Sequence, residues 1–390
     1  MRIAIIAPPW VAVPPPGYGG TEAVIDGLAR GLHDAGHDVL LFATGDSTCP
    51  VPRAWTLPAA VSTVNTGAAT ELRHVISAYD AISAWDADIV HDHTLVGPVY
   101  ARHGDIPVVT TNHGPFNSEL GDLYRVISDH VAVVAISRAQ AAASGNTRIA
   151  AVIHHGLDVD AVPEGRGDGG YAVFLGRMSP DKGVDIAARV AAQAGVPLKI
   201  AAKLAEPAER EFFRTAVEPL LGRDVEYIGE VGGRSKHELL GKAICLLNPL
   251  RWAEPFGMVM IEALASGTPV VATPFGSVSE IVEHGSTGLL AQTERDLTAA
   301  LSQVSALDRA ACRAAVHHRF SLSLMIGRHL RLYERVIAER RRLRATHDTV
   351  PGRRRRTTDI RRTDRTSPMP GSAGCIVPDR SSASPFETRS

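Results

Sequence analysis

The feature that most constrains the fold of this chain is a repeated alternation of short aliphatic runs with helical patterns. Runs such as Ile3–Ile6 and Val108–Thr111 have the length and composition of buried strands. Between such runs, Thr21–Gly36 carries its large apolar residues at the spacing of a single helical face. Strands that alternate with helices form a parallel sheet covered by helices on both sides. The sequence therefore predicts an α/β fold.

The alternation starts a second time after a glycine-rich, polar joint at residues 163–170. In this second series, strand-like runs such as Ala172–Leu175 alternate with helical patterns such as Gly257–Ser266. We therefore predict two doubly wound parallel-sheet domains, over residues 1–160 and 171–320, that face a cleft. Because ligands of such sheets bind at the carboxyl ends of the strands, we expect the functional residues there.

Two further segments follow the second domain. Apolar residues recur at three- and four-residue steps over residues 321–340, which predicts an amphipathic helix packed on one of the domains. From Arg340 onward, 13 arginines stand against 5 acidic residues, and large aliphatic residues are few. Such a segment cannot bury enough surface to offset its ordering entropy, so we predict that residues 341–390 are disordered. This tail is either an electrostatic arm for anionic lipid or nucleic acid, or an extension without a function.

Composition excludes several other classes of protein. With 45% apolar and 21% charged residues, the 390-residue chain has enough apolar material for two cores and is not disordered as a whole. Its longest aliphatic run, Val131–Ile136, is far shorter than the roughly 18 residues of a membrane span. The N-terminus suits a first strand better than a signal peptide, so we expect a cytoplasmic protein. The 4 widely spaced cysteines predict free thiols.

Two loops have residues suited to binding phosphate groups. Gly19 and Gly20 directly precede an expected helix, where backbone N–H groups can approach a phosphate closely. A glycine pair before a helix is, however, more often only a turn. The loop Gly176–Gly183 follows the first strand of the second domain and holds Arg177 and Lys182, a forked and a compact cation. The alternative is that both are ordinary solvated charges.

The segment Asn248–Gly267 carries two glutamates with seven residues between them. Glu254 lies in the loop before an expected helix, and Glu262 lies within that helix among Met, Ile, Val, Leu and Ala. A helix this apolar is buried, and a buried carboxylate needs a partner, which sugar or ribose hydroxyls could supply. The alternative for Glu254 is a carboxylate that offsets the helix dipole, which leaves Glu262 unexplained.

Several histidines and aspartates are candidates for binding a ligand or a metal. His113 ends a predicted strand, where its side chain would meet the cleft, and it is either a ligand contact or a structural residue. The side chains of His91–His93, adjacent in a strand, point to alternate faces, which argues against a shared metal. Asp158 and Asp160 form a DxD pattern of the kind that holds a cation on a nucleotide sugar, but their place near the joint favours a turn.

Together these motifs resemble those of the retaining glycosyltransferases of family four, which share the GT-B fold. The matching elements are Gly19-Gly20, His113-Gly114, the Gly176–Gly183 loop, the E-x7-E spacing of Glu254 and Glu262, and the following Ser266–Thr273. The resemblance covers roughly residues 1–340. It implies two Rossmann-like domains, with the acceptor on the first, the nucleotide-sugar donor on the second, and the last helix crossing back to the first domain.

The resemblance also implies roles for residues at the donor diphosphate. Arg177 and Lys182 would bind it, with Gly19 and Gly20 near it through their backbone. The helix start that follows the first glutamate would offer backbone N–H groups from Phe256, Gly257 and Met258.

Three further residues would contact the rest of the donor. Glu262 would hold the ribose hydroxyls and Glu254 the donor sugar, while His113 would contact the transferred sugar and help to position it. The residues that this resemblance makes catalytic are His113, Arg177, Lys182 and Glu254.

The function implied by the resemblance is that of a retaining, hexosyltransferase-like enzyme, which moves a sugar from a nucleoside-diphosphate sugar to an acceptor hydroxyl without a metal or cofactor. Alternatives on the same fold are a nucleotide-sugar epimerase, a phosphorylase with pyridoxal phosphate, and a non-catalytic nucleotide-sugar-binding protein. The sequence does not specify the nucleotide base or the acceptor, which could be a glycan, a lipid or a small molecule. The tail would be the part that touches an anionic membrane, and we expect no nucleic-acid partner.

Overall fold

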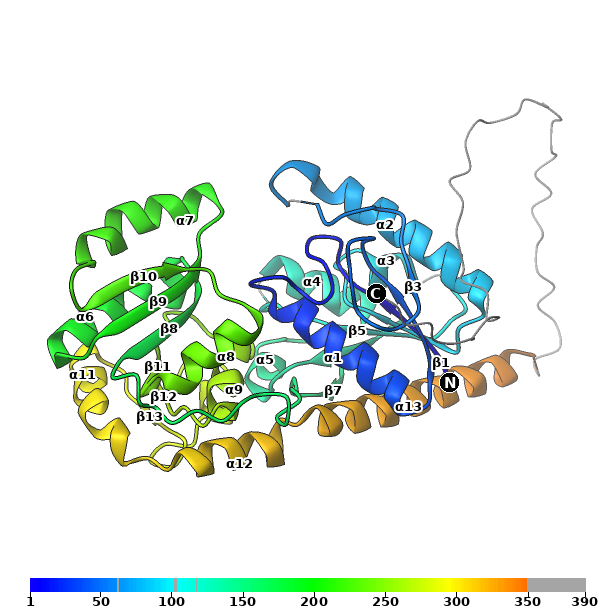
Figure 1. The fold of residues 1–390 in the computed structure, drawn as a ribbon. Coiled ribbons are helices and arrows are strands. Elements are labelled where there is room, and N and C mark those ends of the chain that lie inside the picture. The colour runs from blue at the N-terminus through cyan, green and yellow to red at the C-terminus, as the bar shows by residue number, and fades with distance from the viewer. Residues whose placement is uncertain (62, 102–103, 117, 349–390) are drawn as a thin grey trace, which may run out of the picture. The chain divides into compact units, whose positions relative to one another are not determined.

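The computed structural model of the chain describes residues 1–348 except residues 62, 102–103 and 117. Most of the predicted tail therefore lies outside the described residues. The described part contains two parallel sheets, each with helices on both faces (Figure 1). This confirms the predicted α/β fold with two doubly wound domains. Within this part, no helix combines the length and the apolar character needed to cross a membrane.

The first sheet has seven parallel strands in the order β3-β2-β1-β4-β5-β6-β7. The strands are β1 (Arg2–Ile6), β2 (Asp38–Phe42), β3 (Arg53–Ala54), β4 (Ile89–Asp92), β5 (Val108–Thr111), β6 (Ala132–Ala135) and β7 (Ile149–Val152). The helices between them are α1 (Gly20–Asp34), α2 (Thr63–Trp85), α3 (Gly97–Ala101), α4 (Ser118–Ile127) and α5 (Arg138–Ala142). Strand β3 escapes prediction because two residues give no recognisable aliphatic run.

Alternate residues of β1 pack on opposite faces of this sheet. Ile3 and Ile5 join a buried cluster that includes Ile25 and Leu28 of α1. Ile6 joins the cluster on the other face, where α2 packs. A strand whose two faces are both covered needs apolar residues at successive positions, whereas a half-exposed strand alternates apolar with polar residues. This is why the first strand is recognisable as an uninterrupted aliphatic run.

The second sheet has six parallel strands in the order β10-β9-β8-β11-β12-β13. The strands are β8 (Ala172–Arg177), β9 (Leu198–Lys203), β10 (Val225–Gly229), β11 (Cys245–Asn248), β12 (Val270–Ala272) and β13 (Gly288–Leu290). The helices are α6 (Val184–Ala194), α7 (Pro207–Phe212), α8 (Gly233–Lys242), α9 (Met258–Ala265), α10 (Val278–Ile281), α11 (Glu294–Gln303) and α12 (Arg309–Arg319). Strand β13 is not recognised in advance, since it begins with a glycine and has only two aliphatic residues.

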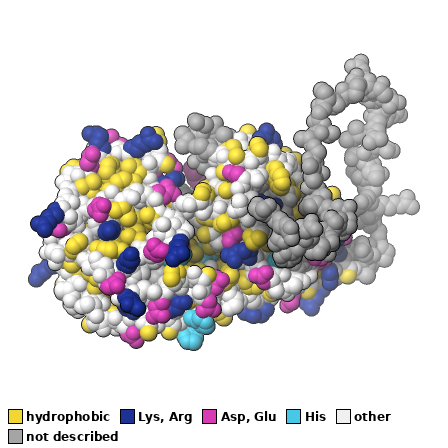
Figure 2. Space-filling view, viewed as in Figure 1, with side chains coloured by type: hydrophobic (Ala, Val, Ile, Leu, Met, Phe, Trp, Pro, Cys, Tyr) yellow, Lys and Arg dark blue, Asp and Glu magenta, His cyan; other side chains and the backbone are white. Residues whose placement is uncertain are grey.

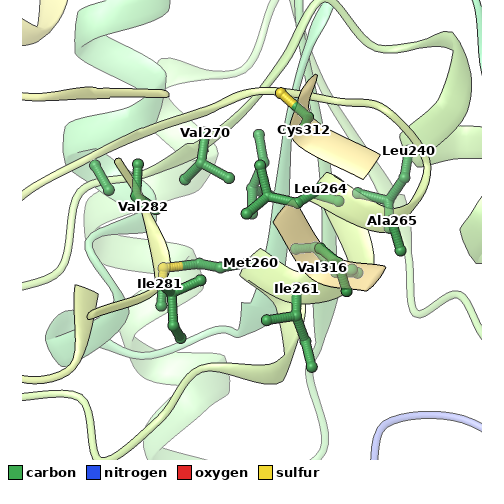
Figure 3. Close-up of a cluster of buried hydrophobic side chains, with 14 of the residues drawn as sticks. Leu240, Met260, Ile261, Leu264, Ala265, Val270, Ile281, Val282, Cys312 and Val316 are labelled. Carbon is green, nitrogen blue, oxygen red and sulfur yellow. The ribbon is translucent and has the colours of Figure 1, made fainter. Parts of the chain in front are cut away.

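Helix α9 lies within a buried core of the second half. Met260 and Ile261 pack in one cluster with Val270 of β12 and Val316 of α12 (Figure 3). All four side chains are fully buried. Because these apolar contacts occupy the core side of α9, Glu262 lies on the remaining side of the helix, where it lines a cleft.

Helix α13 (Leu322–Asp348) returns from the second half to the first. Its residues Met325, Leu332 and Tyr333 join the buried cluster between the first sheet and α1. This is the crossing helix that the resemblance implied.

The end of α13 corrects one prediction. The helix runs to Asp348, beyond the expected end at residue 340, so the prediction of disorder was wrong for residues 341–348. The composition of this stretch shows only that it cannot bury much apolar surface. Arginine, leucine and alanine have high helix propensity, and they allow a helix to extend past its last buried turn. Residues 349–390 lie outside the described residues.

Arginine is the ordinary surface cation of this chain, which has 36 arginines and 5 lysines. On the face shown in Figure 2, Lys and Arg side chains are interspersed with Asp and Glu side chains over the second half. Arg189, for example, pairs with Asp185 and Glu294 at 3.0 and 2.6 Å. Because arginine is the usual cation on the surface, the positions of the few lysines can indicate a functional site.

Candidate active site

A cleft of about 570 Å³ is lined by residues of both halves. The first half contributes the loop between β1 and α1, the start of α1 and His113, which lies two residues after the end of β5. The second half contributes the ends of β8 and β9 and the start of α9. Of the residues predicted for the site, Arg177 is not part of the lining. The structure brings the others together: Gly19, Gly20, His113, Lys182, Glu254, Phe256, Gly257, Met258 and Glu262.

The loop between β1 and α1 reaches across to the second half. The backbone N–H of Tyr18 donates to Glu230 Oε1 at 2.5 Å. A Cβ on Gly17 would lie 2.2 Å from the same oxygen, so any larger residue would displace the Glu230 side chain from this contact. A Cβ on Gly20 would lie 3.7 Å from the side chain of Met258. Since these two residues begin α1 and α9, the positive ends of two helix dipoles meet at the cleft.

Lys182 and Glu254 form an ion pair in the cleft, with side chains only 12% and 11% exposed. Trp252 contacts both partners: its Nε1 donates to Glu254 Oε2 at 3.0 Å, and its ring centroid lies 4.7 Å from Lys182 Nζ. The loop that carries Lys182 is held against the segment before α9, because a Cβ on Gly183 would lie 2.0 Å from the Pro249 carbonyl oxygen. Gly183 also has a φ of 74°, which favours glycine.

Glu262 is paired with a lysine that the sequence analysis does not single out. Lys236 of α8 lies 2.6 Å from Glu262 Oε1, and the Glu262 side chain is 11% exposed. The buried carboxylates that we expected to need hydroxyl partners therefore already have lysine partners. The scarcity of lysine was the sequence signal that could have identified Lys236. The whole chain has only 5 lysines, and Lys182, Lys203 and Lys236 all line the cleft.

Arg177 lies outside the cleft lining, although its position next to a strand end was predicted correctly. It makes a 3.3 Å ion pair with Asp181, and its side chain is 39% exposed. Its guanidinium also interacts with the Tyr18 hydroxyl in the glycine-rich loop. An exposed pair of this kind contributes little to stability, so the guanidinium is free to exchange Asp181 for another anion.

Glu22 is a second residue that sequence reasoning missed. It lies in the first turn of α1, lines the cleft and is 6% exposed. Burial raises the pKa of its carboxyl group to about 7, while the charge of Lys203 acts in the opposite direction. In the sequence, a glutamate in a first helical turn is indistinguishable from one that merely offsets the helix dipole.

His113 lies just after β5 and lines the cleft, as predicted. Its Nε2 and the Nδ1 of His93 are 2.8 Å apart. Its ring stacks on His155 at a centroid distance of 5.1 Å, and His155 in turn contacts Phe256 at 5.0 Å. Burial lowers the pKa of His113 to about 3, so the ring is neutral at pH 7 and carries one N–H.

The side chains of β4 diverge, as the alternation rule predicted. Asp92 accepts a hydrogen bond from Tyr79 of α2 at 2.8 Å. His91 instead faces α13 and lies 2.7 Å from the Tyr333 hydroxyl. The opposite faces of the sheet thus separate Asp92 from the neighbouring histidines.

The DxD pattern does not form a compact acidic site. Asp158 lines the cleft, whereas Asp160 is not part of the lining. Across residues 1–348, apart from the undescribed positions, no three His, Cys, Asp or Glu side chains gather as a metal site would require.

Comparisons with known proteins agree with this geometry. A family profile described as glycosyl transferases group 1 matches residues 160–315. A second profile, described as Glycosyltransferase Family 4, matches residues 18–161. The two matches meet at residues 160–161, just before the joint between the halves, and together cover most residues of both cleft walls.

Individual relatives cover most of the chain. A phosphatidyl-myo-inositol mannosyltransferase of Mycolicibacterium smegmatis is 25% identical over 371 residues, which are 86% of this chain and 94% of the relative. A D-inositol 3-phosphate glycosyltransferase of the same organism is 32% identical over 229 residues, 52% of this chain and 50% of the relative.

Solved structures share the architecture. AviGT4, a glycosyltransferase involved in avilamycin A biosynthesis, matches with a TM-score of 0.65 and 26% identity, covering 86% of this chain and 98% of its own. A sucrose-phosphate synthase from Thermosynechococcus elongatus has the same fold, with a TM-score of 0.71 and 20% identity over 87% of this chain and 99% of its own. The motifs, the two facing sheets and these matches together show that the chain belongs to glycosyltransferase family four and has the GT-B fold.

Proposed function

We propose that this glycosyltransferase moves a hexose from a nucleoside-diphosphate sugar to an acceptor hydroxyl with retention of configuration, and that it needs neither a metal nor an organic cofactor. The observation that carries the proposal is the presence of Lys182 and Lys236, paired with both glutamates of the E-x7-E motif, in one cleft beside two helix N-termini. This set of groups matches a ligand that combines a diphosphate with sugar hydroxyls.

The cationic groups would bind the diphosphate. Lys182 and the N-termini of α1 and α9 supply positive charge at the cleft, and charge-assisted hydrogen bonds to phosphate are the strong ones. Arg177, at 39% exposure, can turn from Asp181 toward a phosphate. Because the protein already supplies these charges, a divalent cation is not needed to neutralise the leaving group.

The two glutamates would bind the sugar and the ribose. When a phosphate oxygen takes a hydrogen bond from Lys182, Glu254 is left with acceptor capacity for a hydroxyl of the donor sugar. Lys236 and Glu262 offer a donor and an acceptor to the ribose hydroxyls in the same way. The ion pairs therefore keep the buried charges compensated and can be exchanged for donor contacts.

The leaving group determines what the site must stabilise during the reaction. As the bond between the anomeric carbon and the phosphate oxygen breaks, negative charge develops on the diphosphate, and fixed cations and N–H groups stabilise it. Loss of one such donor typically costs roughly 3–4 kcal/mol, or about 10²–10³ in rate. For retention, the acceptor oxygen would attack from the face that the phosphate leaves, and its proton would pass to the departing phosphate.

We also propose where the acceptor binds and where in the cell the enzyme acts. The first half would bind an acceptor hydroxyl on a glycan, a lipid or a small molecule; two relatives are named for phosphatidyl-myo-inositol and D-inositol 3-phosphate. We propose a cytoplasmic enzyme whose residues beyond 348, outside the described part, contact anionic membranes. Binding to acidic but not neutral liposomes, lost when these residues are deleted, would support this; equal binding to both would contradict it.

The direct test of the function is incubation with UDP-, GDP- and ADP-sugars, with release of the nucleoside diphosphate followed by chromatography. We expect release from one class of donor, and NMR of the sugar product should show the donor's anomeric configuration. The inverted configuration would disprove retention. A change of the sugar while it is still attached to its nucleotide would instead identify an epimerase. Binding of a donor without any turnover, with every acceptor class offered, would favour the non-catalytic alternative.

A further inference from the structure

A row of imidazole rings runs through the first half from the crossing helix to the cleft. The rings come from α13, from β4 and from the segments after β4, β5 and β7. Neighbouring ring centroids are 4.1–5.2 Å apart, in the order His329, His91, His93, His113 and His155. Only the last two line the cleft. The other three form a buried layer behind them.

Burial keeps these rings neutral near pH 7. It lowers the pKa of His329 to about 4 and that of His113 to about 3, and it holds the pKa of His91 and His93 well below the usual range. A neutral imidazole has one nitrogen that donates and one that accepts. The chemistry that His113 offers to the cleft therefore depends on which of its nitrogens carries the hydrogen.

Two hydrogen bonds to residues outside the row fix the orientation of the His91 ring. His91 Nδ1 lies 2.7 Å from the Tyr333 hydroxyl, and His91 Nε2 lies 2.8 Å from Thr111 Oγ1. Both nitrogens of His91 are thus occupied, and the ring cannot form a hydrogen bond to His93, whose ring centroid lies 4.1 Å away. His93 is thereby held between His91 and His113.

The hydrogen bond between His93 and His113 has two arrangements of unequal cost. If His113 Nε2 carried the hydrogen, His93 would have its own hydrogen on Nε2, which is buried without a partner among the described residues. If His93 Nδ1 carries the hydrogen instead, only a lone pair remains unsatisfied on His93 Nε2. A buried N–H without an acceptor is rarer in proteins than an under-satisfied acceptor. The second arrangement is therefore favoured.

We propose that His93 is a positioning residue that donates to His113 Nε2 and so fixes His113 in the tautomer with its hydrogen on Nδ1. His113 Nδ1 has no hydrogen-bond partner among the described residues, and the ring lines the cleft. His113 therefore enters the cleft as a hydrogen-bond donor, directed at an oxygen of the transferred sugar. The contact with the transferred sugar rests on the proposed function, whereas the tautomer of His113 does not.

The tautomer is measured without any substrate. In protein labelled with ¹⁵N-histidine, long-range ¹H–¹⁵N NMR distinguishes a protonated from an unprotonated ring nitrogen, and the His113→Gln variant identifies the signals of His113. We expect a protonated Nδ1 and an unprotonated Nε2. The opposite pattern in the wild-type protein would overturn the proposal, whatever donor the enzyme uses.

A matched pair of variants tests the consequence for catalysis. His93→Asn keeps an amide N–H that can donate to His113, whereas His93→Leu has nearly the same shape and cannot donate. With the nucleotide sugar that the screen described above identifies as donor, we expect His93→Leu to lower kcat by about 10², the usual effect of misplacing one hydrogen-bond donor, and His93→Asn to recover most of that loss. KM for the donor should change little in either variant.

The two variants also separate positioning from a merely structural role. If both lower kcat equally while His113 keeps its Nδ1 hydrogen, the proposal is wrong. If His93→Leu fails to fold, the tautomer of His113 in His93→Asn and in the wild-type protein decides the question: retention of the Nδ1 hydrogen in both supports it, and its absence in either contradicts it. A wild-type protein that processes no nucleotide sugar would refute the proposed function and leave the tautomer result standing.

Discussion

The two halves of the molecule line one cleft with different chemistry. All 5 lysines occur at or after residue 182, and residues 1–181 contain none. On the wall of the second half, Lys182 and Lys236 are held in ion pairs with glutamates. On the wall of the first half, the neutral imidazole of His113 and the buried carboxyl group of Glu22 replace them. The second half thus presents lysine–glutamate pairs, whereas the first half combines one arginine–aspartate pair, Arg30 with Asp26 at 2.9 Å, with groups whose burial disfavours charge.

This difference indicates how the halves divide the work. A diphosphate carries its charge permanently, so the wall that binds it needs permanent cations, and pairing with glutamate limits the cost of burying them. A sugar or an acceptor hydroxyl is uncharged, so the facing wall can use neutral donors and acceptors. The predictions that follow test whether the two walls respond differently to pH, substitution and chelation.

The largest difference is expected on acidification. His74, His91, His93, His113, His155 and His329 all have a pKa below the usual 6.5 because of burial. Below pH 6.5 the unfolded chain therefore binds protons that the folded chain does not, and stability falls as the pH falls. These six groups together contribute a slope of at most about 8 kcal/mol per pH unit, and Glu22 and Asp92, whose burial raises the carboxyl pKa to about 7 and about 6, oppose part of it.

Hydrogen exchange measured separately on peptides of each half checks this prediction between pH 7.5 and 5.5. After correction for the intrinsic pH dependence of exchange, the first half should lose protection first. The proposed difference between the halves is contradicted if both lose protection in parallel, or if acidification stabilises the protein.

The second prediction concerns the lysines on the wall of the second half. Lys182→Ala should lower turnover by roughly 10²-fold, because it removes one cation from the leaving phosphate. Lys242→Ala is the matched control: Lys242 is exposed at the end of α8, so its loss should leave turnover unchanged. Arg177→Ala should cost less than Lys182→Ala, since Arg177 lies outside the cleft lining. Steady-state rates at saturating donor measure these effects. Equal rates for the two lysine variants would contradict the assignment of Lys182 to the diphosphate site.

The third prediction concerns Glu22 on the opposite wall. Because burial raises the pKa of its carboxyl group to about 7, the folded state favours the protonated form, and the residue costs stability as the pH rises through the range from about 4.5 to 7. Glu22→Gln should therefore stabilise the protein at pH 8 relative to its effect at pH 4.5, by up to about 3 kcal/mol.

Denaturant unfolding of the wild-type and Glu22→Gln proteins at both pH values measures this difference. Glu226→Gln is the control, since Glu226 is exposed on β10 and should show the same effect at both pH values. A Glu22→Gln effect that does not change with pH would show that its carboxyl group titrates normally.

The smallest effect is expected from metal removal. If Lys182, Arg177 and two helix N-termini stabilise the leaving group, then excess EDTA should leave turnover within experimental error of the untreated enzyme. A complete loss of activity that Mg²⁺ or Mn²⁺ restores would transfer this role to a bound cation, with Asp158 as the first ligand to test because it lines the cleft.

The two walls also differ in how far the sequence predicts them. Lys182, Glu254 and Glu262 lie in two contiguous motifs that follow strand ends, so their spacing along the chain is sufficient to place them together. The partners of His113 cannot be found in this way: His93 and His155 are brought to it from two separate segments by the folding of the first half.

Two other features could not be predicted from motifs in the sequence. Lys236 meets Glu262 across two helices, 26 residues apart in the chain, and no motif links them. The extension of the last helix to Asp348 depends on helix propensity, whereas the prediction of disorder depended on the lack of burial. The sheets, by contrast, were predictable because strands buried on both faces leave uninterrupted aliphatic runs.

The most direct test of this division of work is calorimetric titration of nucleoside diphosphates into three proteins: the wild type, Lys182→Ala and His113→Gln. We expect one of UDP, GDP and ADP to bind the wild type, Lys182→Ala to weaken that binding at least about tenfold through loss of a charge-assisted hydrogen bond, and His113→Gln to leave it unchanged. Equal weakening by both substitutions, or undiminished binding to Lys182→Ala, would contradict the assignment of the diphosphate to the second half and of the sugar to the first.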